Sequence, residues 1–425
     1  MLQGLRALRK KFASDQCLAT IRFRSCGRIE FLLLVFLSLL PPVAQGRIEY
    51  ALKAGNNRCT ACHYSPAGGG SRNINGKYFG AFGHPPLKKN WLQNQDNVGL
   101  EAKFLYYRPE TPSQVRGGMG VMFGTVWGSI EIQELSQESS ELRLVAEQNL
   151  GGFSAGPRQW YARWKLHEDT ATSWLPQYVL LGRIIPAFGV LTDEHRTYVR
   201  IQSGTVWHTG YDTGLMLSAN PFESLHYDVA VVNGKKNAGT ALANEMADVW
   251  GVIGNIRWAP ISMPLFVGYS QSYYPSTSTE REANANSVYG SFSFYRLTKS
   301  KMPLSLTAEF VTAKNWNSSF TSTFVSDSTY ATQVAQAYSY GLLALAQWDF
   351  SPKFAIQYKY DQLELNHDFP SDRYTRHGVG VKAYLANNVF GLLRIETAKA
   401  GHPAEAQGVK TGAQDAVWGL LNISL

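Results

Sequence analysis

The sequence predicts an all-β protein: a transmembrane antiparallel β-barrel of about 16 strands, with a short N-terminal segment of little regular structure. Three observations predict it. Apolar and polar residues alternate with a period of two in segments of about ten residues. Aromatic residues make up 13% of the chain and charged residues only 17%. Long polar connections follow every other predicted strand, as in bacterial barrels.

The N-terminus predicts an export signal. Residues 31–40 form an apolar run, too short for a membrane-spanning helix, which needs about 20 apolar residues. Basic residues precede it and small residues, Ala44 and Gly46, follow it, so residues 1–46 are assigned to a signal peptide. Residues 1–46 contain seven Lys and Arg residues and two Asp and Glu residues. They therefore contribute +5 to the chain's net charge of +8. The remaining charge of about +3 gives no case for nucleic-acid binding.

The cysteines predict a haem site. Cys17 and Cys26 lie in the signal peptide, and the other two belong to Cys59-Thr60-Ala61-Cys62-His63. The spacing C-x-x-C-H is typical of c-type haem attachment, in which both thiols bind haem vinyl groups and the histidine is the proximal iron ligand. Residues 47–95 are therefore predicted to carry one covalent haem c. A redox disulfide would need a βαβ context, and a zinc site would need two further ligands, and neither is found nearby.

Two other residues of this segment are candidates for haem contacts. Arg72 follows a glycine-rich stretch and is a candidate partner for a haem propionate, the alternative being a flexible turn. His84 is the nearest candidate for the sixth iron ligand, the alternative being a solvated linker residue. Met119 and Met122 come later in the chain, and a five-coordinate iron or another ligand from the barrel also stays open.

Residues 96–425 are assigned to the barrel. Phe354, Ile356 and Tyr358 alternate with Gln357, Lys359 and Asp361, so the polar side chains share the opposite face of this strand. The apolar face of residues 250–258 begins and ends in Trp, which fits aromatic girdles at the membrane interfaces. Sixteen strands are predicted to start near residues 98, 117, 141, 158, 176, 208, 223, 247, 264, 286, 303, 337, 354, 374, 389 and 414.

The connections fit this topology. Short turns follow even-numbered strands and long polar loops often follow odd-numbered ones, so both ends of the barrel are expected in the periplasm together with the haem segment. The last strand alternates to the final residue. It resembles the closing strand of assembled barrels, although it ends in Leu425 rather than an aromatic residue. A soluble sandwich would also alternate. The aromatic content, the lack of disulfides and the order of strands and turns argue against it.

One stretch interrupts the alternation. Residues 182–189 (GRIIPAFG) look like a stretch found in many porin-like barrels, and Pro186 excludes a plain central-strand position. We expect an ordinary outer loop here. The alternatives are that the charged residues 192–196 fold into the lumen as a constriction, or that His195 approaches the haem.

The motif CTACHYSPAGGGSRN followed by a barrel resembles a group of bacterial outer-membrane proteins that contain cytochrome c. It is more loosely similar to porin–cytochrome conduits, in which a barrel sheathes haem proteins for electron transfer. The close part of the resemblance covers residues 59–80. This chain departs from the conduits because it has one attachment motif instead of many, and one haem cannot relay electrons across an apolar slab of roughly 30 Å.

The leading functional hypothesis is therefore electron transfer at or across the outer membrane, in contact with its lipid. Its expected partners are periplasmic c-type cytochromes or other redox carriers. The alternative is a porin for small solutes whose haem segment acts as plug, gate or sensor. A stand-alone enzyme such as a haem peroxidase ranks last, because no distal acid–base pair can be placed and no catalytic residue is predicted.

Overall fold

The structure is a computed structural model. It describes residues 97–110, 118–135, 140–152, 156–167, 172–190, 197–202, 211–233, 250–260, 263–275, 282–294, 303–314, 337–351, 353–367, 373–386, 389–400 and 415–424. Among these residues no helix is long and apolar enough to cross a membrane.

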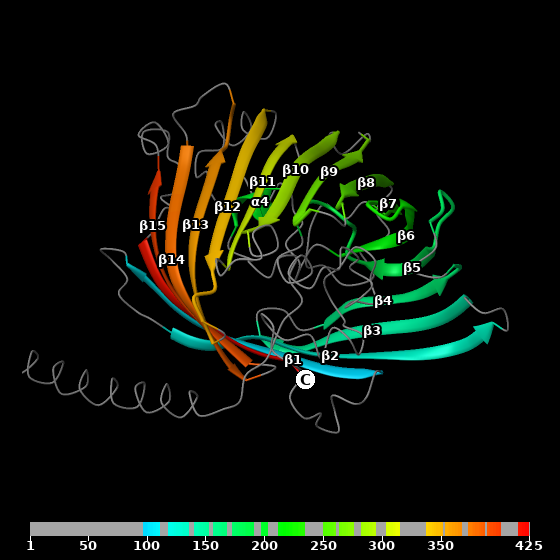
Figure 1. Cartoon of the computed structure of the whole chain (residues 1–425), viewed down its shortest axis with the longest axis horizontal. Coiled ribbons are helices and arrows are strands. Elements are labelled where there is room, and N and C mark those ends of the chain that lie inside the picture. The colour runs from blue at the N-terminus through cyan, green and yellow to red at the C-terminus, as the bar shows by residue number, and fades with distance from the viewer. Residues whose placement is uncertain are drawn as a thin grey trace, which may run out of the picture.

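The described residues form sixteen strands and one short helix (Figure 1). Their bounds are β1 Val98–Glu110, β2 Gly118–Leu135, β3 Ser140–Gly152, β4 Gly156–Lys165, β5 Tyr178–Ile184, α4 Tyr198–Gln202, β6 Asp212–Phe222, β7 Leu225–Val232, β8 Gly251–Trp258, β9 Leu265–Tyr274, β10 Ala283–Ser293, β11 Leu304–Lys314, β12 Tyr338–Trp348, β13 Phe354–Glu364, β14 Arg373–Ala386, β15 Val389–Ala400 and β16 Asp415–Ser424.

The strands close into a barrel in chain order. Each strand pairs with its sequence neighbours, and β1 pairs antiparallel with β16, with Glu101 opposite Ser424 and Tyr107 opposite Trp418. Closure leaves no edge strand with unpaired backbone groups, which a strand in lipid could not tolerate. The predicted all-β antiparallel barrel of about 16 strands is confirmed. The predicted starts lie within four residues of the observed ones, the largest differences being 208 against 212 and 247 against 251.

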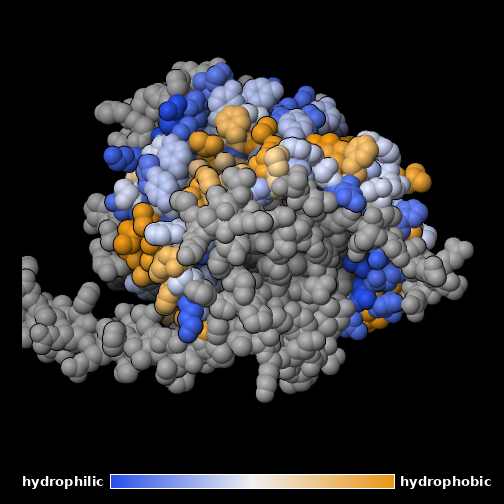
Figure 2. Space-filling view, in the orientation of Figure 1, coloured by the Kyte–Doolittle hydropathy of each residue, from blue (hydrophilic) through white to orange (hydrophobic). Residues whose placement is uncertain are grey.

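The strand alternation separates an apolar outer face from a polar inner face, because successive side chains of a strand point to opposite sides of the sheet. In β13, Phe354, Ile356 and Tyr358 are exposed outward, whereas Gln357 and Lys359 are fully buried inward. Figure 2 shows apolar residues gathered on parts of the outer wall. This pattern is that of a barrel surrounded by lipid, with polar groups lining the lumen.

Aromatic side chains collect near the strand ends of the outer face. Trp250 and Trp258, which bound the outer face of β8, are both exposed, as the alternation predicts. At the turn after β12, the ring of Phe350 stacks on that of Phe354 with their centroids 6.2 Å apart, and Trp348 lies 6.1 Å from Phe350. Such rings are amphipathic or polarisable and favour the membrane–water interface.

The barrel has two unlike ends. At one end the strands are joined by short turns, such as Glu223 and Ser224 between β6 and β7, and here β1 begins and β16 ends. We call this the short-turn end. Both termini of the barrel therefore lie at the same end, as the predicted order of short and long connections requires.

Candidate functional site

The candidate site is the lumen, and the chain leaves β5 to enter it. The strand ends at Ile184, two residues before Pro186, which has no N–H to donate to a sheet. Gly182 has a φ of 137° and Gly189 a φ of 61°, values that L side chains rarely adopt. A Cβ on Gly182 would also lie 2.8 Å from Cα of Tyr161. Pro186 thus accounts for the end of the strand, and Gly189 allows the backbone to turn after it.

Residues 185–190 and 197–202, which we call the lumen segment, are tied to the opposite strands. The N–H of Gly189 donates to Oγ of Ser270 on β9 at 2.9 Å, and the N–H of Val190 donates to Glu309 on β11 at 3.3 Å. The side chain of Phe188 is completely buried. These hydrogen bonds fix the backbone that follows β5 against β9 and β11.

The helix α4 continues these ties along the wall. The N–H of Tyr198, its first residue, donates to both carboxylate oxygens of Asp361 on β13, at 3.1 and 3.0 Å. Nε2 of Gln202 donates to Oγ of Ser339 on β12 at 2.8 Å. Gly341 makes room for α4, because a Cβ there would lie 3.0 Å from Cγ1 of Val199. A carboxylate at the first turn of a helix is also favoured by the helix dipole.

The expectation of an ordinary outer loop after β5 is therefore wrong for the lumen segment. Residues 185–190 and 197–202 fold inward and narrow the lumen. The alternative that the sequence left open concerned the charged residues 192–196 and stays a prediction. The charged residues 192–196, including His195, lie outside the described residues. The partners of the lumen segment are 81 to 163 residues away along the chain, so no local pattern could have indicated them.

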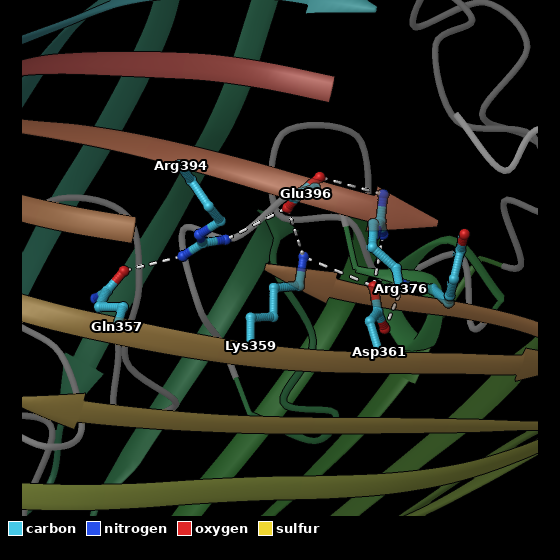
Figure 3. A network of polar contacts seen from close by, with 7 residues as sticks. Gln357, Lys359, Asp361, Arg376, Arg394 and Glu396 are labelled. Atoms are coloured by element: carbon cyan, nitrogen blue, oxygen red, sulfur yellow. Dashed lines mark hydrogen bonds and ion pairs between the residues drawn. The ribbon is translucent and has the colours of Figure 1, made fainter. Parts of the chain in front are cut away.

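An ion network lines the lumen where α4 docks (Figure 3). Nζ of Lys359 lies 3.6 Å from Asp361 and 3.7 Å from Glu396 on β15. Arg376 on β14 contacts the same two carboxylates, at 2.5 Å from Asp361 and 3.8 Å from Glu396. The guanidinium of Arg376 also lies 4.3 Å from the ring centroid of Tyr198. Asp361 therefore connects α4 to the wall.

The network continues along the wall through Arg394 of β15. Its Nη1 lies 3.7 Å from Glu396, and its Nη2 donates to Oε1 of Gln357 at 2.9 Å. The network has three cations, Lys359, Arg376 and Arg394, and two carboxylates, all nearly or completely buried. Buried charges are tolerated only when they are paired and hydrogen-bonded, so each member holds its neighbours in place.

A second charged group lies on β3 and β4. Nη1 of Arg158 lies 3.0 Å from Glu147 and donates to Oγ1 of Thr125 at 2.8 Å. The ring centroid of Tyr211 lies 5.6 Å from the guanidinium of Arg158 and 5.5 Å from that of Arg183. The lumen wall thus presents both signs of charge, held by contacts within the wall.

The predicted haem residues belong to a part of the chain that the structure does not describe. Cys59, Cys62, His63, Arg72 and His84 all lie outside the described residues. Within the described parts of the chain, no group of three or more His, Cys, Asp or Glu residues could hold a metal ion.

The two later methionine candidates are separated by the wall of β2. Met119 is exposed on the outer side, whereas Met122 is buried among lumen-facing apolar residues.

The ion network of Lys359, Asp361, Arg376, Arg394 and Glu396 was not predicted from the sequence. Lys359 and Asp361 were predicted to share a face of their strand, but their partners on β14 and β15 follow only from the strand register.

The sequence matches no protein-family model and no curated protein. The fold matches solved structures of outer-membrane channels. Salmonella typhi OmpF in complex with daunomycin aligns with a TM-score of 0.55 at 11% identity, over 77% of this chain and 97% of that one. The outer membrane channel DcaP of Acinetobacter baumannii aligns with a TM-score of 0.53 at 8% identity, over 77% and 96%. An anion-selective porin from Comamonas acidovorans aligns with a TM-score of 0.51 at 11% identity, over 77% and 98%. The chain therefore has the fold of an outer-membrane porin-like β-barrel.

Proposed function

We propose that this protein is an outer-membrane porin-type channel for small solutes, narrowed by the lumen segment and carrying a haem-bearing plug or gate at its N-terminus. The observation that carries the channel proposal is the docking of backbone from the β5–β6 connection onto β9, β11, β12 and β13 inside a closed barrel. A barrel of 16 strands leaves room for an aqueous lumen, and inward-folded backbone with fixed charges reduces its width.

The proposed orientation places the short-turn end in the periplasm, as in bacterial barrels. The outer face supports a position in the outer membrane, because exposed Leu, Ile, Val and aromatic side chains cover it. The charges of both signs on the lumen wall favour hydrophilic solutes over apolar ones.

Planar-bilayer recording tests the channel. A specific protease site inserted between Asp96 and Asn97 allows the N-terminal segment to be removed from the folded, full-length protein. We expect discrete conductance steps, larger after cleavage than before. Uninserted protein treated with the same protease is the control. Folded protein that shows no steps in either state would overturn the channel proposal.

The haem remains part of the proposal because of the motif at residues 59–63. Cys59 and Cys62 would hold the haem covalently and His63 would be its proximal ligand, with Arg72 at a propionate and His84 as the sixth ligand. We expect a haem-stained band on a denaturing gel that disappears in Cys59→Ala and Cys62→Ala. His84→Ala should keep the band and change the absorption spectrum. An unstained wild-type protein from outer membranes would remove the haem from the proposal.

The second candidate function is electron exchange with periplasmic c-type cytochromes or other redox carriers, and the same motif favours it. Stopped-flow mixing of the oxidised protein with reduced periplasmic cytochromes tests it. Reduction of the haem on a timescale of milliseconds to seconds would support electron transfer. Failure to exchange electrons with any native donor would leave the channel as the function.

A further inference from the structure

The turn at Gly189 in the lumen segment is held by polar side chains of β8, β9 and β10, strands that carry no member of the ion network. Oγ of Ser270 on β9 accepts from the N–H of Gly189 at 2.9 Å and donates to Oδ1 of Asn255 on β8, also at 2.9 Å. The hydroxyl of Tyr289 on β10 donates to the same oxygen of Asn255. We call Asn255, Ser270 and Tyr289 the polar clasp.

Tyr289 reaches Asn255 across an intervening strand. In the β9–β10 register Tyr289 lies opposite Gly268. A Cβ on Gly268 would lie 2.2 Å from Cζ of Tyr289, so the ring can cross β9 only over a glycine. The ring also belongs to the same buried apolar cluster as Val190 of the lumen segment. Tyr289 therefore links Asn255 to the cluster that holds Val190.

Asp228 on β7 orients the polar clasp. Its side chain is buried, and its Oδ2 accepts from Nδ2 of Asn255 at 2.9 Å. An ionised carboxylate can only accept, so the amide of Asn255 turns its N–H groups toward Asp228 and its oxygen toward β9 and β10. The hydroxyl hydrogen of Ser270 is then used toward Asn255, and its lone pairs face the N–H of Gly189. One carboxylate thus sets the direction of donation through the whole group.

The buried charge of Asp228 is compensated by its neighbours on β6 and β7. Oδ1 accepts from Oγ of Ser218 at 2.6 Å and lies 3.1 Å from Nε2 of His226. Nδ1 of His226 lies 3.0 Å from Oδ1 of Asn220, so both ring nitrogens face oxygen atoms. Only an imidazolium has two N–H groups, so a positively charged His226 satisfies both contacts and pairs with Asp228. Arg257 on β8, opposite His226 in the strand register, is a further cation of this face.

We propose that Asp228, Asn255 and Tyr289 are positioning residues that hold residues 185–190 in the lumen and so set the width of the channel. The inference rests on the proposed channel and assigns part of its narrowing to β7–β10. Asp361 holds α4 on β13, so the lumen segment is anchored at two separate places. The bond from Val190 to Glu309 remains when the clasp is lost, so residues 185–190 should loosen and not come free.

Single-channel recording of the full-length protein tests the polar clasp. Asp228→Asn keeps the size of the side chain and places an N–H group where the clasp needs an acceptor. We expect the ratio of time at the wide conductance level to time at the narrow level to rise about tenfold, because a hydrogen bond to a charged group is lost. Tyr289→Phe, which removes only a hydroxyl, replaces it if Asp228→Asn does not assemble. An assembled variant with the wild-type ratio would overturn the proposal.

Ser272 provides a matched control for Ser270. Both face the lumen on β9 and are completely buried, but Oγ of Ser272 has no hydrogen-bond partner among the described residues. We expect Ser270→Ala to raise the ratio and Ser272→Ala to leave it unchanged. Asp228→Asn combined with Ser270→Ala should add little to either variant alone, because both weaken the same bond to Gly189. Fully additive effects would overturn the connection between Asp228 and Gly189.

An exchange of the two side chains separates orientation of the clasp from a general loss of stability. Asp228→Asn together with Asn255→Asp moves the carboxylate one strand along, where it still accepts from Ser270 and Tyr289. We expect this double variant to return the ratio toward the wild-type value, because the hydroxyl of Ser270 again donates to position 255. A ratio as high as in Asp228→Asn alone would overturn the orienting role of the carboxylate.

Hydrogen–deuterium exchange, read by mass spectrometry on peptides that contain residues 185–190, separates the polar clasp from the channel. These peptides should exchange faster in Asp228→Asn and Ser270→Ala than in the wild type and in Ser272→Ala, whether or not the barrel conducts. Faster exchange in protein that shows no conductance steps would support the clasp and overturn the channel. Conductance steps with unchanged exchange in the variants would overturn the clasp and leave the channel proposal standing.

Discussion

At the residue scale, Asp361 connects the lumen segment to the wall. It accepts from the N–H of Tyr198 and pairs with Lys359 and Arg376, all nearly or completely buried. The alternation placed Asp361 on the inner face of its strand, so its direction could be predicted from the sequence. Its partners could not, because Tyr198 is 163 residues away and Arg376 meets it only through the β13–β14 register.

We expect Asp361→Ala to lower the free energy of unfolding by about 3–5 kcal/mol, because removing one partner of a buried pair leaves uncompensated charge. It should also make the channel conductance larger and noisier, because α4 loses its anchor. Asp361→Asn keeps an acceptor for the N–H of Tyr198 and should show a smaller change in conductance. Urea unfolding and bilayer recording measure the two effects. An Ala variant with wild-type stability and conductance would show that Asp361 does not hold α4.

Gly182 lies in β5, two residues before the strand ends, in a backbone conformation that L side chains rarely adopt. Its φ of 137° and the nearby Tyr161 backbone leave no room for a Cβ. We expect Gly182→Ala to destabilise the protein by about 1–3 kcal/mol. Gly254→Ala is the control, since a Cβ there meets nothing within 4 Å, and its effect should stay within about 0.5 kcal/mol. Urea unfolding measures the stability of both variants. An equal loss of stability in Gly182→Ala and Gly254→Ala would show that position 182 does not require glycine.

At the element scale, the strands could be predicted and the lumen segment could not. Apolar and polar residues alternate along each strand, so the strand can be recognised from its own residues. Because one face contacts lipid, the outward positions are consistently apolar. Pro186 correctly indicated the end of β5, but the direction of the following chain depends on Ser270 and Glu309 on distant strands. Local sequence determines where a strand stops, and tertiary contacts determine where the chain goes next.

The outward face of β15 allows a test of its contact with lipid. Ile395 lies in the middle of the strand and is highly exposed outward. We expect Ile395→Lys to destabilise the folded barrel in bilayers by about 2–4 kcal/mol, because a lysine at the midplane must enter hydrocarbon. Ile395→Leu should cost less than about 1.5 kcal/mol. The free energy of unfolding is measured in lipid vesicles. If both variants unfold with the same free energy as the wild type, Ile395 does not face lipid.

At the scale of the whole molecule, closure between β1 and β16 places both ends of the barrel at the short-turn end. The sequence predicted this arrangement because the connections alternate in length and the strand number is even. It also predicted the haem residues, Cys59, Cys62 and His63, which lie outside the described residues and stay a prediction. The buried apolar cluster around the β1–β16 seam, which includes Met122, Phe390 and Trp418, had no such pattern. Its residues come from β2 and from β13 to β16, which only closure brings together.

The topology predicts the sidedness of the N-terminal segment. In intact cells, a protease site inserted between Asp96 and Asn97 should resist protease added outside and be cut once the outer membrane is permeabilised. A site placed in residues 401–414, between β15 and β16, should be cut in intact cells because it lies at the other end of the barrel. The reverse pattern would show that the barrel is inserted the other way.

The long-range ties of the lumen segment also impose an order on assembly. The segment leaves β5, but its anchors on β9, β11, β12 and β13 exist only after those strands have joined the sheet. The narrowing of the lumen must therefore come late, and a nearly complete barrel should exist briefly with a wide interior. Because contacts so distant in sequence form slowly, this late step is a natural point of control for whatever machinery inserts the barrel.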